Sequence, residues 1–178
     1  LLEIFLQVCR TLAHTHSKGV IHRDLKPANV LTGEFGATYL IDWGLAKVWG
    51  EPDPRPTGTK ESNDPTLTPA GRRYGTPLYM APEIARGESH VDARTDVFGL
   101  GHILFEILTH RQIIQGQDIK EVETNLLEKP FPTPREVAPD KDIPLQLEEI
   151  CLKALQKDRR QRYPSVDSMM DELLAYLD

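Results

Sequence analysis

Apolar side chains recur at three- and four-residue steps in several stretches of the chain, which is the spacing of an amphipathic helix. The chain opens in such a stretch at residues 1–13, and two more follow at residues 147–155 and 165–177. The stretch 97–108 is different because apolar residues cover every side of it. A helix that is apolar all round belongs in a core, so the pattern predicts a mainly helical protein built around residues 97–108.

The final stretch has the clearest helix signals. Ser165 is a good N-cap, and Asp167 complements the helix dipole in the first turn. The side chains expected on the buried face of this helix are Val166, Met169, Met170, Leu173, Leu174 and Leu177. Prolines between residues 130 and 144 predict a rigid connection ahead of the helix at 147–155.

Between the first helix and the core helix the pattern changes to short apolar runs. The runs at residues 30–31 and 39–41 are separated by Gly33-Glu34-Phe35-Gly36, which is typical of a small β-hairpin. The stretch VIHRDLKPANVL is then a loop between helix and hairpin. Residues 50–69 are rich in proline and polar side chains, so we expect a mobile loop without regular structure there.

Composition and charge narrow the class of protein. The 178 residues are 39% apolar and 27% charged, which is typical of one globular domain. The net charge of −6 leaves no broad basic face for nucleic acid or an anionic membrane. Cys9 and Cys151 lie in apolar helical contexts, which favours reduced thiols over a disulfide, and no stretch is apolar for long enough to span a bilayer. We expect a cytoplasmic segment without nucleic-acid or membrane contacts.

Oxygen-bearing side chains gather in the two loops that flank the predicted hairpin. Asp24 and Asn29 precede the hairpin and Asp42 follows it, so all three are expected at one end of the same small sheet. Asn29 and Asp42 provide a partial ligand set for a hard cation such as Mg²⁺. Asp24 could accept a proton from an attacking hydroxyl while Lys26 neutralises phosphate charge. Taken singly, Asp24 is more simply a loop cap, and Asp42 a turn former before Gly44.

Three motifs in a fixed order carry a resemblance to a known family. The chain contains HRDLKPANV from His22, DWG from Asp42 and GTPLYMAPE from Gly75, and His22 and Asn29 satisfy the spacing H-R-D-x-x-x-x-N. Together these motifs resemble the catalytic loop, the metal-binding loop and the end of the activation segment of protein kinases. The residues within these motifs are similar to those of bacterial serine/threonine kinases, and the resemblance covers essentially the whole chain.

The resemblance implies an α+β, mainly helical fold, namely the large C-terminal lobe of a protein kinase with a small β-hairpin. On that basis residues 1–178 are the C-lobe only, with a catalytic loop at 22–29, an activation segment at 42–83 and a helical subdomain at 92–178. The family's Gly-rich loop and strand lysine have no counterpart in the sequence, so we expect the N-lobe to be absent. Gly99-Leu100-Gly101 lacks the third glycine of a phosphate loop. The 178 residues alone should therefore bind ATP poorly.

The resemblance also implies the chemistry of the intact parent, which is ATP-dependent phosphorylation of serine and threonine hydroxyls on protein substrates. Asp24 would orient or deprotonate the substrate hydroxyl, and Lys26 would contact the γ-phosphate of ATP. Asn29 and Asp42 would hold Mg²⁺, with Mn²⁺ as a possible substitute. Thr76, together with Lys26, favours serine or threonine over tyrosine as the acceptor.

Further residues are implied to regulate or support this site. Arg23 and Lys47 would bind a phosphate on the activation segment, with Thr68 as the best phosphoacceptor and Thr66 as the next. The phosphate would offset the entropy of ordering a loop rich in proline and glycine.

Three charged side chains are implied to be structural. Glu83 would pair with Arg162, and Asp96 would hold the backbone of the catalytic loop. His22 is implied to pack rather than to act as a base. Trp43 departs from the family's Asp-Phe-Gly pattern, and its indole needs more room than a phenyl ring and a partner for its N–H.

Two other functions share parts of these motifs. A noncatalytic, pseudokinase-like docking module is the alternative, but such modules usually lack Asp24, Asn29 or Asp42, and all three are present. A phosphotransferase for small molecules would share the catalytic loop and the metal aspartate, whereas the segment GTPLYMAPE favours peptide binding. The parent could be anchored to a membrane through a segment outside these 178 residues.

Overall fold

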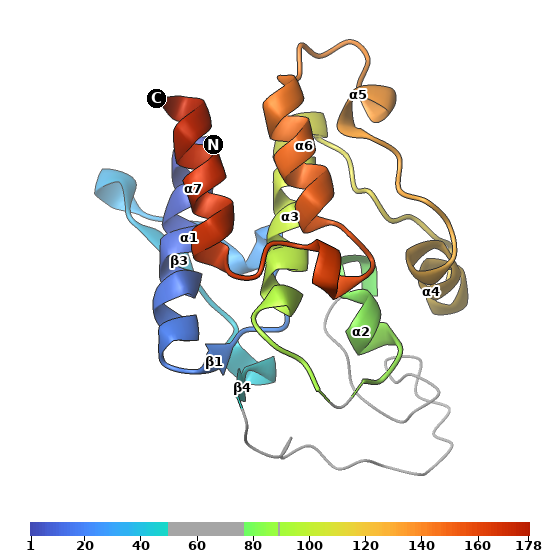
Figure 1. Ribbon diagram of the computed structural model, residues 1–178, viewed down its shortest axis with the longest axis horizontal. Coiled ribbons are helices and arrows are strands. Elements are labelled where there is room, and N and C mark those ends of the chain that lie inside the picture. Colours follow the sequence, from blue (N-terminus) through green and yellow to red (C-terminus); the bar gives the residue numbers. More distant parts are fainter. Residues whose placement is uncertain (50–76, 89) are drawn as a thin grey trace.

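The computed structural model describes residues 1–49, 77–88 and 90–178. Most of these residues are helical (Figure 1). The helices are α1 (Leu2–Ser17), α2 (Pro82–Ala85), α3 (Arg94–Thr109), α4 (Ile119–Leu127), α5 (Pro134–Val137), α6 (Leu145–Ala154) and α7 (Val166–Leu177). The strands are β1 (Val20–Ile21), β2 (Val30–Thr32), β3 (Thr38–Leu40) and β4 (Lys47–Val48). The predicted mainly helical fold is confirmed.

The strands form two separate antiparallel sheets of two strands each. Strands β2 and β3 make the predicted hairpin, with Val30 opposite Leu40 and Thr32 opposite Thr38. Strands β1 and β4 make a second pair that the sequence did not predict, because two residues are too few to show an alternating pattern. This second pair brings the start of the loop 22–29 next to the segment that follows Asp42.

Helix α3 runs through the centre of the molecule and packs on α1, α6 and α7 (Figure 1). Its buried side chains lie on all sides of the helix, so the prediction of a central core helix is confirmed. The fully buried apolar residues of α3 with less than 1% exposure are Val97, Phe98, Leu100, Leu104 and Phe105. The rest of the core comes mainly from α1, α6 and α7, which therefore hold α3 in place.

Helix α7 begins at the predicted N-cap, where Ser165 and Ser168 form a reciprocal capping box. Its buried residues are Val166, Met169 and Leu173. The predicted burial of Leu174 and Leu177 is wrong, since these side chains are 40% and 49% exposed. Helix α7 lies in the outer layer beside α1, so only one narrow stripe of it meets the core (Figure 1).

Two helices between residues 118 and 137 were not anticipated. The Asp118 carboxylate caps α4 by accepting a hydrogen bond of 2.8 Å from the backbone N–H of Glu121. The proline-rich connection contains the one-turn helix α5, whose N-terminus carries a capping box of Thr133 and Glu136. Pro134 occupies the first turn, where its missing N–H costs nothing. Prolines here therefore start a helix as well as stiffen a loop.

Both cysteines are buried, unpaired thiols, as predicted. Burial raises the pKa of Cys9 and of Cys151, so neither side chain is a reactive thiolate. The Cys151 Sγ lies 3.5 Å from the Gly101 carbonyl oxygen, at the contact between α6 and α3. Among the described residues, no helix combines the length and the apolar character needed to cross a bilayer.

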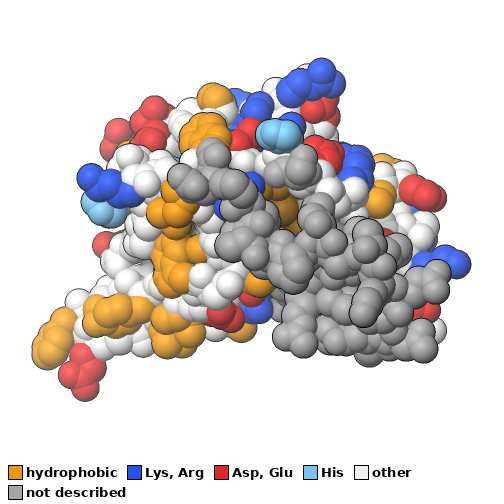
Figure 2. Space-filling model, turned by 90° about the horizontal axis from the view of Figure 1, so that it is seen from below, with side chains coloured by type: hydrophobic (Ala, Val, Ile, Leu, Met, Phe, Trp, Pro, Cys, Tyr) orange, Lys and Arg blue, Asp and Glu red, His pale blue; other side chains and the backbone are white. Residues whose placement is uncertain are grey.

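Large apolar side chains are exposed along the hairpin and the segment after it. Figure 2 shows hydrophobic side chains gathered along this side of the molecule. The exposed residues of this strip are Leu31, Phe35, Tyr39, Ile41, Val48 and Trp49. Phe35, at the hairpin turn, is the most exposed of them, and it has a positive φ of 58°. The strip is a surface that a further protein element could cover.

Glycines let α3 approach its neighbours closely at two points. A Cβ added at Gly101 would lie 2.8 Å from Leu155 Cγ and 3.1 Å from Ala154 Cβ. A Cβ added at Gly99 would lie 2.7 Å from Leu25 Cβ, in the loop 22–29. These contacts set the spacing between α3, the end of α6 and the loop.

We predict that Gly101→Ala destabilises the fold. Alanine in a helix interior normally gains about 1 kcal/mol over glycine, but overpacking a core costs about 1–3 kcal/mol. The cost of the close contact with Leu155 should exceed the gain in helix propensity, so the free energy of unfolding in a urea titration should fall. The control Asp171→Ala, at an exposed position of α7, should change it by less than about 0.5 kcal/mol. A Gly101→Ala variant more stable than wild type would contradict the close packing.

Candidate active site

The loop 22–29 is attached to the core by a buried carboxylate from the first turn of α3. Asp96 is 1% exposed, and its carboxylate accepts backbone N–H bonds of 2.8 Å from His22 and 2.8 Å from Arg23. His16, near the end of α1, lies with its Nε2 2.7 Å from the same carboxylate. Arg23 is held at a φ of 68°, a left-handed conformation that is uncommon for residues with a side chain. Asp96 therefore fixes the conformation in which the loop begins.

His22 and Trp43 pack together beneath this loop. The two rings meet edge-on with centroids 4.5 Å apart, and His22 is fully buried. His22 Nδ1 accepts a 3.3 Å hydrogen bond from the Asp24 N–H, so Nε2 is the nitrogen that donates to the Ile41 carbonyl at 3.1 Å. The Trp43 Nε1–H donates to the Leu40 carbonyl at 2.9 Å, which gives the indole the partner it needs. Nδ1 of His22 is thus used within the loop, and Nε2 joins the loop to the segment before Trp43.

Asp24, Lys26 and Asn29 form one cluster in the loop. Lys26 Nζ lies 2.8 Å from Asp24 Oδ2, and both side chains are largely buried. Asn29 is 4% exposed, and its Nδ2 donates to the Asp24 carbonyl at 2.8 Å and approaches Asp24 Oδ2 at 3.4 Å. The short 3₁₀ turn Pro27–Asn29 brings Asn29 back toward Asp24. A carboxylate, an ammonium and a carboxamide are therefore held together at fixed spacing.

Asp42 follows the hairpin directly and lies beside this cluster in the fold. The backbone N–H of its neighbour Ile41 donates to the Asn29 carbonyl at 2.9 Å. Asp42 itself is exposed and has a φ of 63°. Only four residues with side chains have positive φ in the described part of the chain, and Arg23 and Asp42 are two of them. Such backbone strain is concentrated at functional sites, because the surrounding structure must maintain it.

The donors at this position fit a hard divalent cation. The Asn29 amide nitrogen is bound to Asp24, so Oδ1 is the atom that Asn29 can offer to a metal, and Asp42 contributes a carboxylate. The described residues include no group of three or more His, Cys, Asp or Glu side chains that could hold a metal without other ligands. Mg²⁺ usually binds one or two carboxylates and completes its shell with water and phosphate, so two protein ligands suit it.

Arg23 and Lys47 lie on the two segments that β1 and β4 bring together. The Arg23 Nε–H donates to the Leu45 carbonyl at 2.7 Å, and Lys47 pairs in register with Ile21. Thr66, Thr68 and Thr76, together with the predicted mobile loop at 50–69, lie outside the described residues. The geometry therefore places the two basic residues near one another without placing their predicted phosphoacceptors.

Glu83 and Arg162 form a buried ion pair. Glu83 is 2% exposed and accepts two 2.8 Å hydrogen bonds from the Arg162 guanidinium, one on each carboxylate oxygen. The Thr95 hydroxyl donates a third bond to Glu83 at 2.8 Å. Arg162 also donates to the Arg94 carbonyl at 2.9 Å and lies over the Phe98 ring. The pair therefore ties α2 to the start of α3.

His16 is the supporting residue that sequence reasoning missed. No metal-ligand or catalytic spacing in the sequence includes it. Its partner Asp96 is 80 residues away in the sequence, so no local pattern could have joined the two. The one available signal was its position just before the loop, at the end of an amphipathic helix.

A family model described as "Protein kinase domain" matches residues 1–174. The chain belongs to this family. The match covers nearly the whole chain, including the loop 22–29, the hairpin and the helices that surround α3. The motifs on which the sequence-based resemblance rested are therefore those of a true family member.

Named relatives of this kinase domain are bacterial serine/threonine-protein kinases. The chain is 34% identical to the kinase PknD of Protochlamydia amoebophila, with 100% of the chain and 18% of that protein covered. It is 37% identical to PknD of Chlamydia caviae, with 99% and 19% covered. It is 30% identical to the probable kinase PknB of Bifidobacterium longum, with 99% and 24% covered. The chain thus spans only about a fifth of the length of such relatives.

We predict that Glu83→Ala strongly destabilises the kinase domain. Removing one partner of a buried ion pair leaves an uncompensated charge and costs about 3–5 kcal/mol. Thermal unfolding followed by circular dichroism should show a much lower midpoint for this variant. The control Arg160→Ala removes a guanidinium from an exposed pair with Asp158 and should leave the midpoint unchanged. A Glu83→Ala variant that melts like wild type would show that the Glu83–Arg162 pair does not stabilise the fold.

Proposed function

We propose that the intact protein is a serine/threonine protein kinase that transfers the γ-phosphoryl group of ATP to hydroxyl groups on protein substrates. The observation that carries this proposal is the cluster of Asp24, Lys26 and Asn29 in one loop, which Asp96 attaches to the core and which Asp42 flanks. The relatives named as serine/threonine-protein kinases support the choice of acceptor.

Asp24 is the group that would orient the substrate hydroxyl and accept its proton. Both its side chain and its backbone are held, because Lys26 and Asn29 contact the Asp24 carboxylate and the Asp24 N–H donates to His22. A base held in place in this way loses little entropy when the hydroxyl arrives. Lys26, at 2.8 Å from Asp24, would also place its positive charge near the transferred phosphoryl group.

Asn29 and Asp42 are the residues that would hold Mg²⁺, or Mn²⁺ in its place. When bound, the ion neutralises charge on the phosphates of ATP. The proposal is supported by the oxygen donors of these residues and by the backbone bond that joins Ile41 to Asn29. Thr76, together with Lys26, would favour serine and threonine acceptors over tyrosine.

Arg23 and Lys47 would form a binding site for a phosphate on the activation segment, with Thr68 as the preferred acceptor and Thr66 as the second. The proposal is supported by the β1–β4 pairing, since β4 carries Lys47 and β1 ends two residues before Arg23. Two cations near one phosphate give charge-assisted hydrogen bonds that can order a loop.

We further propose that residues 1–178 act as the large lobe of the kinase and need a small lobe to grip ATP. The sequence has no Gly-rich phosphate loop. Gly99 and Gly101 belong to α3, where they pack against Leu25 of the loop 22–29 and Leu155 at the end of α6. The segment alone is thus expected to phosphorylate poorly. A cytoplasmic location is supported by the two buried, unpaired thiols, which need no oxidising compartment.

The proposed function is tested by Asp24→Asn in the intact protein. Loss of the base should lower the rate of substrate phosphorylation about 10²–10⁴-fold, measured with radiolabelled ATP and a generic protein substrate. Binding of Mg²⁺-ATP should change little, because Asp24 is not assigned to the nucleotide. The control Asp171→Asn, at an exposed position of α7, should keep the wild-type rate. Undiminished phosphorylation by Asp24→Asn would contradict the proposal, and a wild-type protein without activity would favour the docking module.

A further inference from the structure

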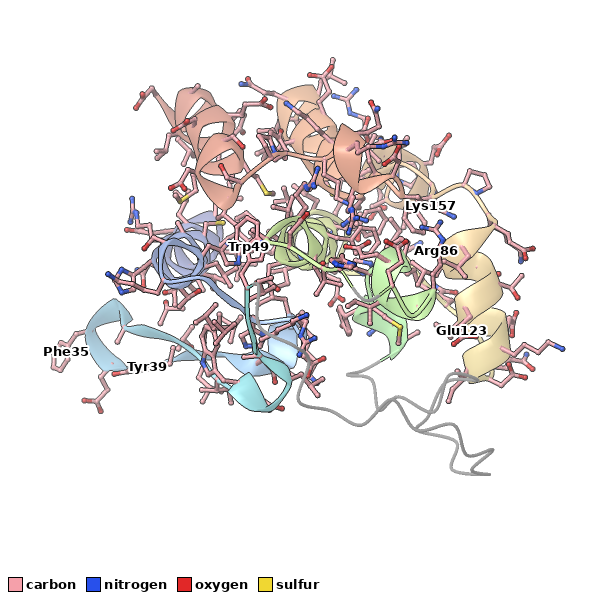
Figure 3. The ribbon with its side chains drawn as sticks, turned by 60° about the horizontal axis from the view of Figure 1, so that its bottom comes forward. Phe35, Tyr39, Trp49, Arg86, Glu123 and Lys157 are labelled. Atoms are coloured by element: carbon pink, nitrogen blue, oxygen red, sulfur yellow. The ribbon has the colours of Figure 1, made fainter. Side chains whose placement is uncertain are left out.

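An open cavity of about 600 Å³ lies between α2, the end of α4 and residues 157–160. It is lined by the four cationic side chains of Arg86, Lys157, Arg159 and Arg160, by the three acidic side chains of Glu83, Glu88 and Asp158, and by Leu127 of α4. Figure 3 shows Arg86 and Lys157 near one another, on the side of α2 that faces α4. The sequence carries a net charge of −6, so a cluster of cations around this cavity is opposite in sign to the net charge of the protein.

The acidic side chains of this cavity are largely satisfied by neighbours. Glu83 is bound by Arg162 and Thr95. Asp158 accepts a 2.8 Å hydrogen bond from the Arg160 guanidinium and a 3.0 Å bond from the Arg160 N–H. These carboxylates therefore leave little negative charge to offset the remaining cations.

The other cations have only weak carboxylate partners in the described part of the chain. Glu88 lies 3.7 Å from both Arg86 and Arg159, so one carboxylate is shared between two guanidinium groups. Lys157 Nζ donates to the Lys129 carbonyl and lies 4.7 Å from the centre of the Phe131 ring. Burial lowers the pKa of Lys157, and the nearby Arg86 guanidinium lowers it further, while the Glu128 carboxylate partly opposes both effects. An anion between Arg86 and Lys157 would relieve this repulsion.

Two walls of the cavity, α2 and the segment around Lys157, are held in place by one buried side chain. The Arg162 guanidinium binds Glu83 of α2, and its Nε–H donates to the Gln156 carbonyl at 2.7 Å. A further bond of 3.3 Å reaches the Lys157 carbonyl. The elements that carry Arg86 and Lys157 are therefore fixed to the same group, and the cavity is formed before any ligand arrives. A preformed site binds at a lower entropic cost than one that must be ordered.

We propose that this cavity binds an acidic segment of a partner protein, whose carboxylates pair with Arg86 and Lys157 and whose apolar side chains contact Leu127. A volume of about 600 Å³ lies within the roughly 300–1,000 Å³ of ligand pockets in proteins, so it can admit side chains of a peptide. The open cations supply charge complementarity, and Leu127 supplies an apolar wall. This site is separate from the cluster around Asp24 and does not depend on the proposed function.

The proposal is tested by fluorescence anisotropy with a fluorescein-labelled peptide of alternating Glu and Leu residues and its Gln-for-Glu counterpart. The Glu peptide should bind the purified protein more tightly, and salt should weaken its binding. Arg86→Gln and Lys157→Gln should each raise the dissociation constant about fivefold, in line with the loss of one partly exposed ion pair. Arg86 is a safe site for substitution because its side chain is 45% exposed.

The matched control is Lys18→Gln, which removes an exposed cation at the end of α1, outside the cavity. It should leave the dissociation constant unchanged, and circular dichroism should show that all variants are folded. The proposal is overturned if Arg86→Gln and Lys157→Gln bind like wild type. It is also overturned if Lys18→Gln weakens binding equally, or if the Gln peptide binds as tightly as the Glu peptide. The assay contains no ATP, so its result is independent of kinase activity.

Discussion

The carboxylate of Asp96 is the interaction on which the candidate active site depends. It is buried in the first turn of α3, where an unpaired charge would be costly, and it is stabilised by donors from His22, Arg23 and His16. The two backbone N–H groups that it accepts from lie immediately before Asp24. Because α3 is the most buried helix of the core, the loop takes its position from the most rigid part of the molecule.

The first turn of α3 also anchors the region of the proposed peptide site. The Thr95 hydroxyl donates to Glu83, and the Arg94 carbonyl accepts a bond from Arg162. The Glu83–Arg162 pair holds α2 and, through the Lys157 carbonyl, one further wall of the cationic cavity. One helix end thus supports both the loop around Asp24 and the surface around Lys157. The close approach of Leu25 to Gly99 adds a steric constraint to the same arrangement, since α3 could not accept a larger residue there without moving the loop.

The sequence predicted those elements whose signal is local and strong. The helical stretches were visible in their apolar spacing, and HRDLKPANV indicated that Asp24 and Asn29 share a loop, which the structure places in contact. The exposed positions of Leu174 and Leu177 were not predictable, because periodicity defines an apolar face but not how much of it a neighbour covers. The β1–β4 pair and the contact between His16 and Asp96 join residues far apart in sequence, so no local pattern contained them.

The most direct test of this account is native-state amide hydrogen exchange in an Asp96→Asn variant. The account predicts that the amides of His22 and Arg23 exchange about ten- to a hundredfold faster than in wild type, because a charged acceptor contributes about 1.5–3 kcal/mol to such a bond. The amides of Leu104 and Phe105, deeper in α3, should change much less. Unchanged exchange at His22 and Arg23 would contradict the claim that Asp96 holds the loop 22–29.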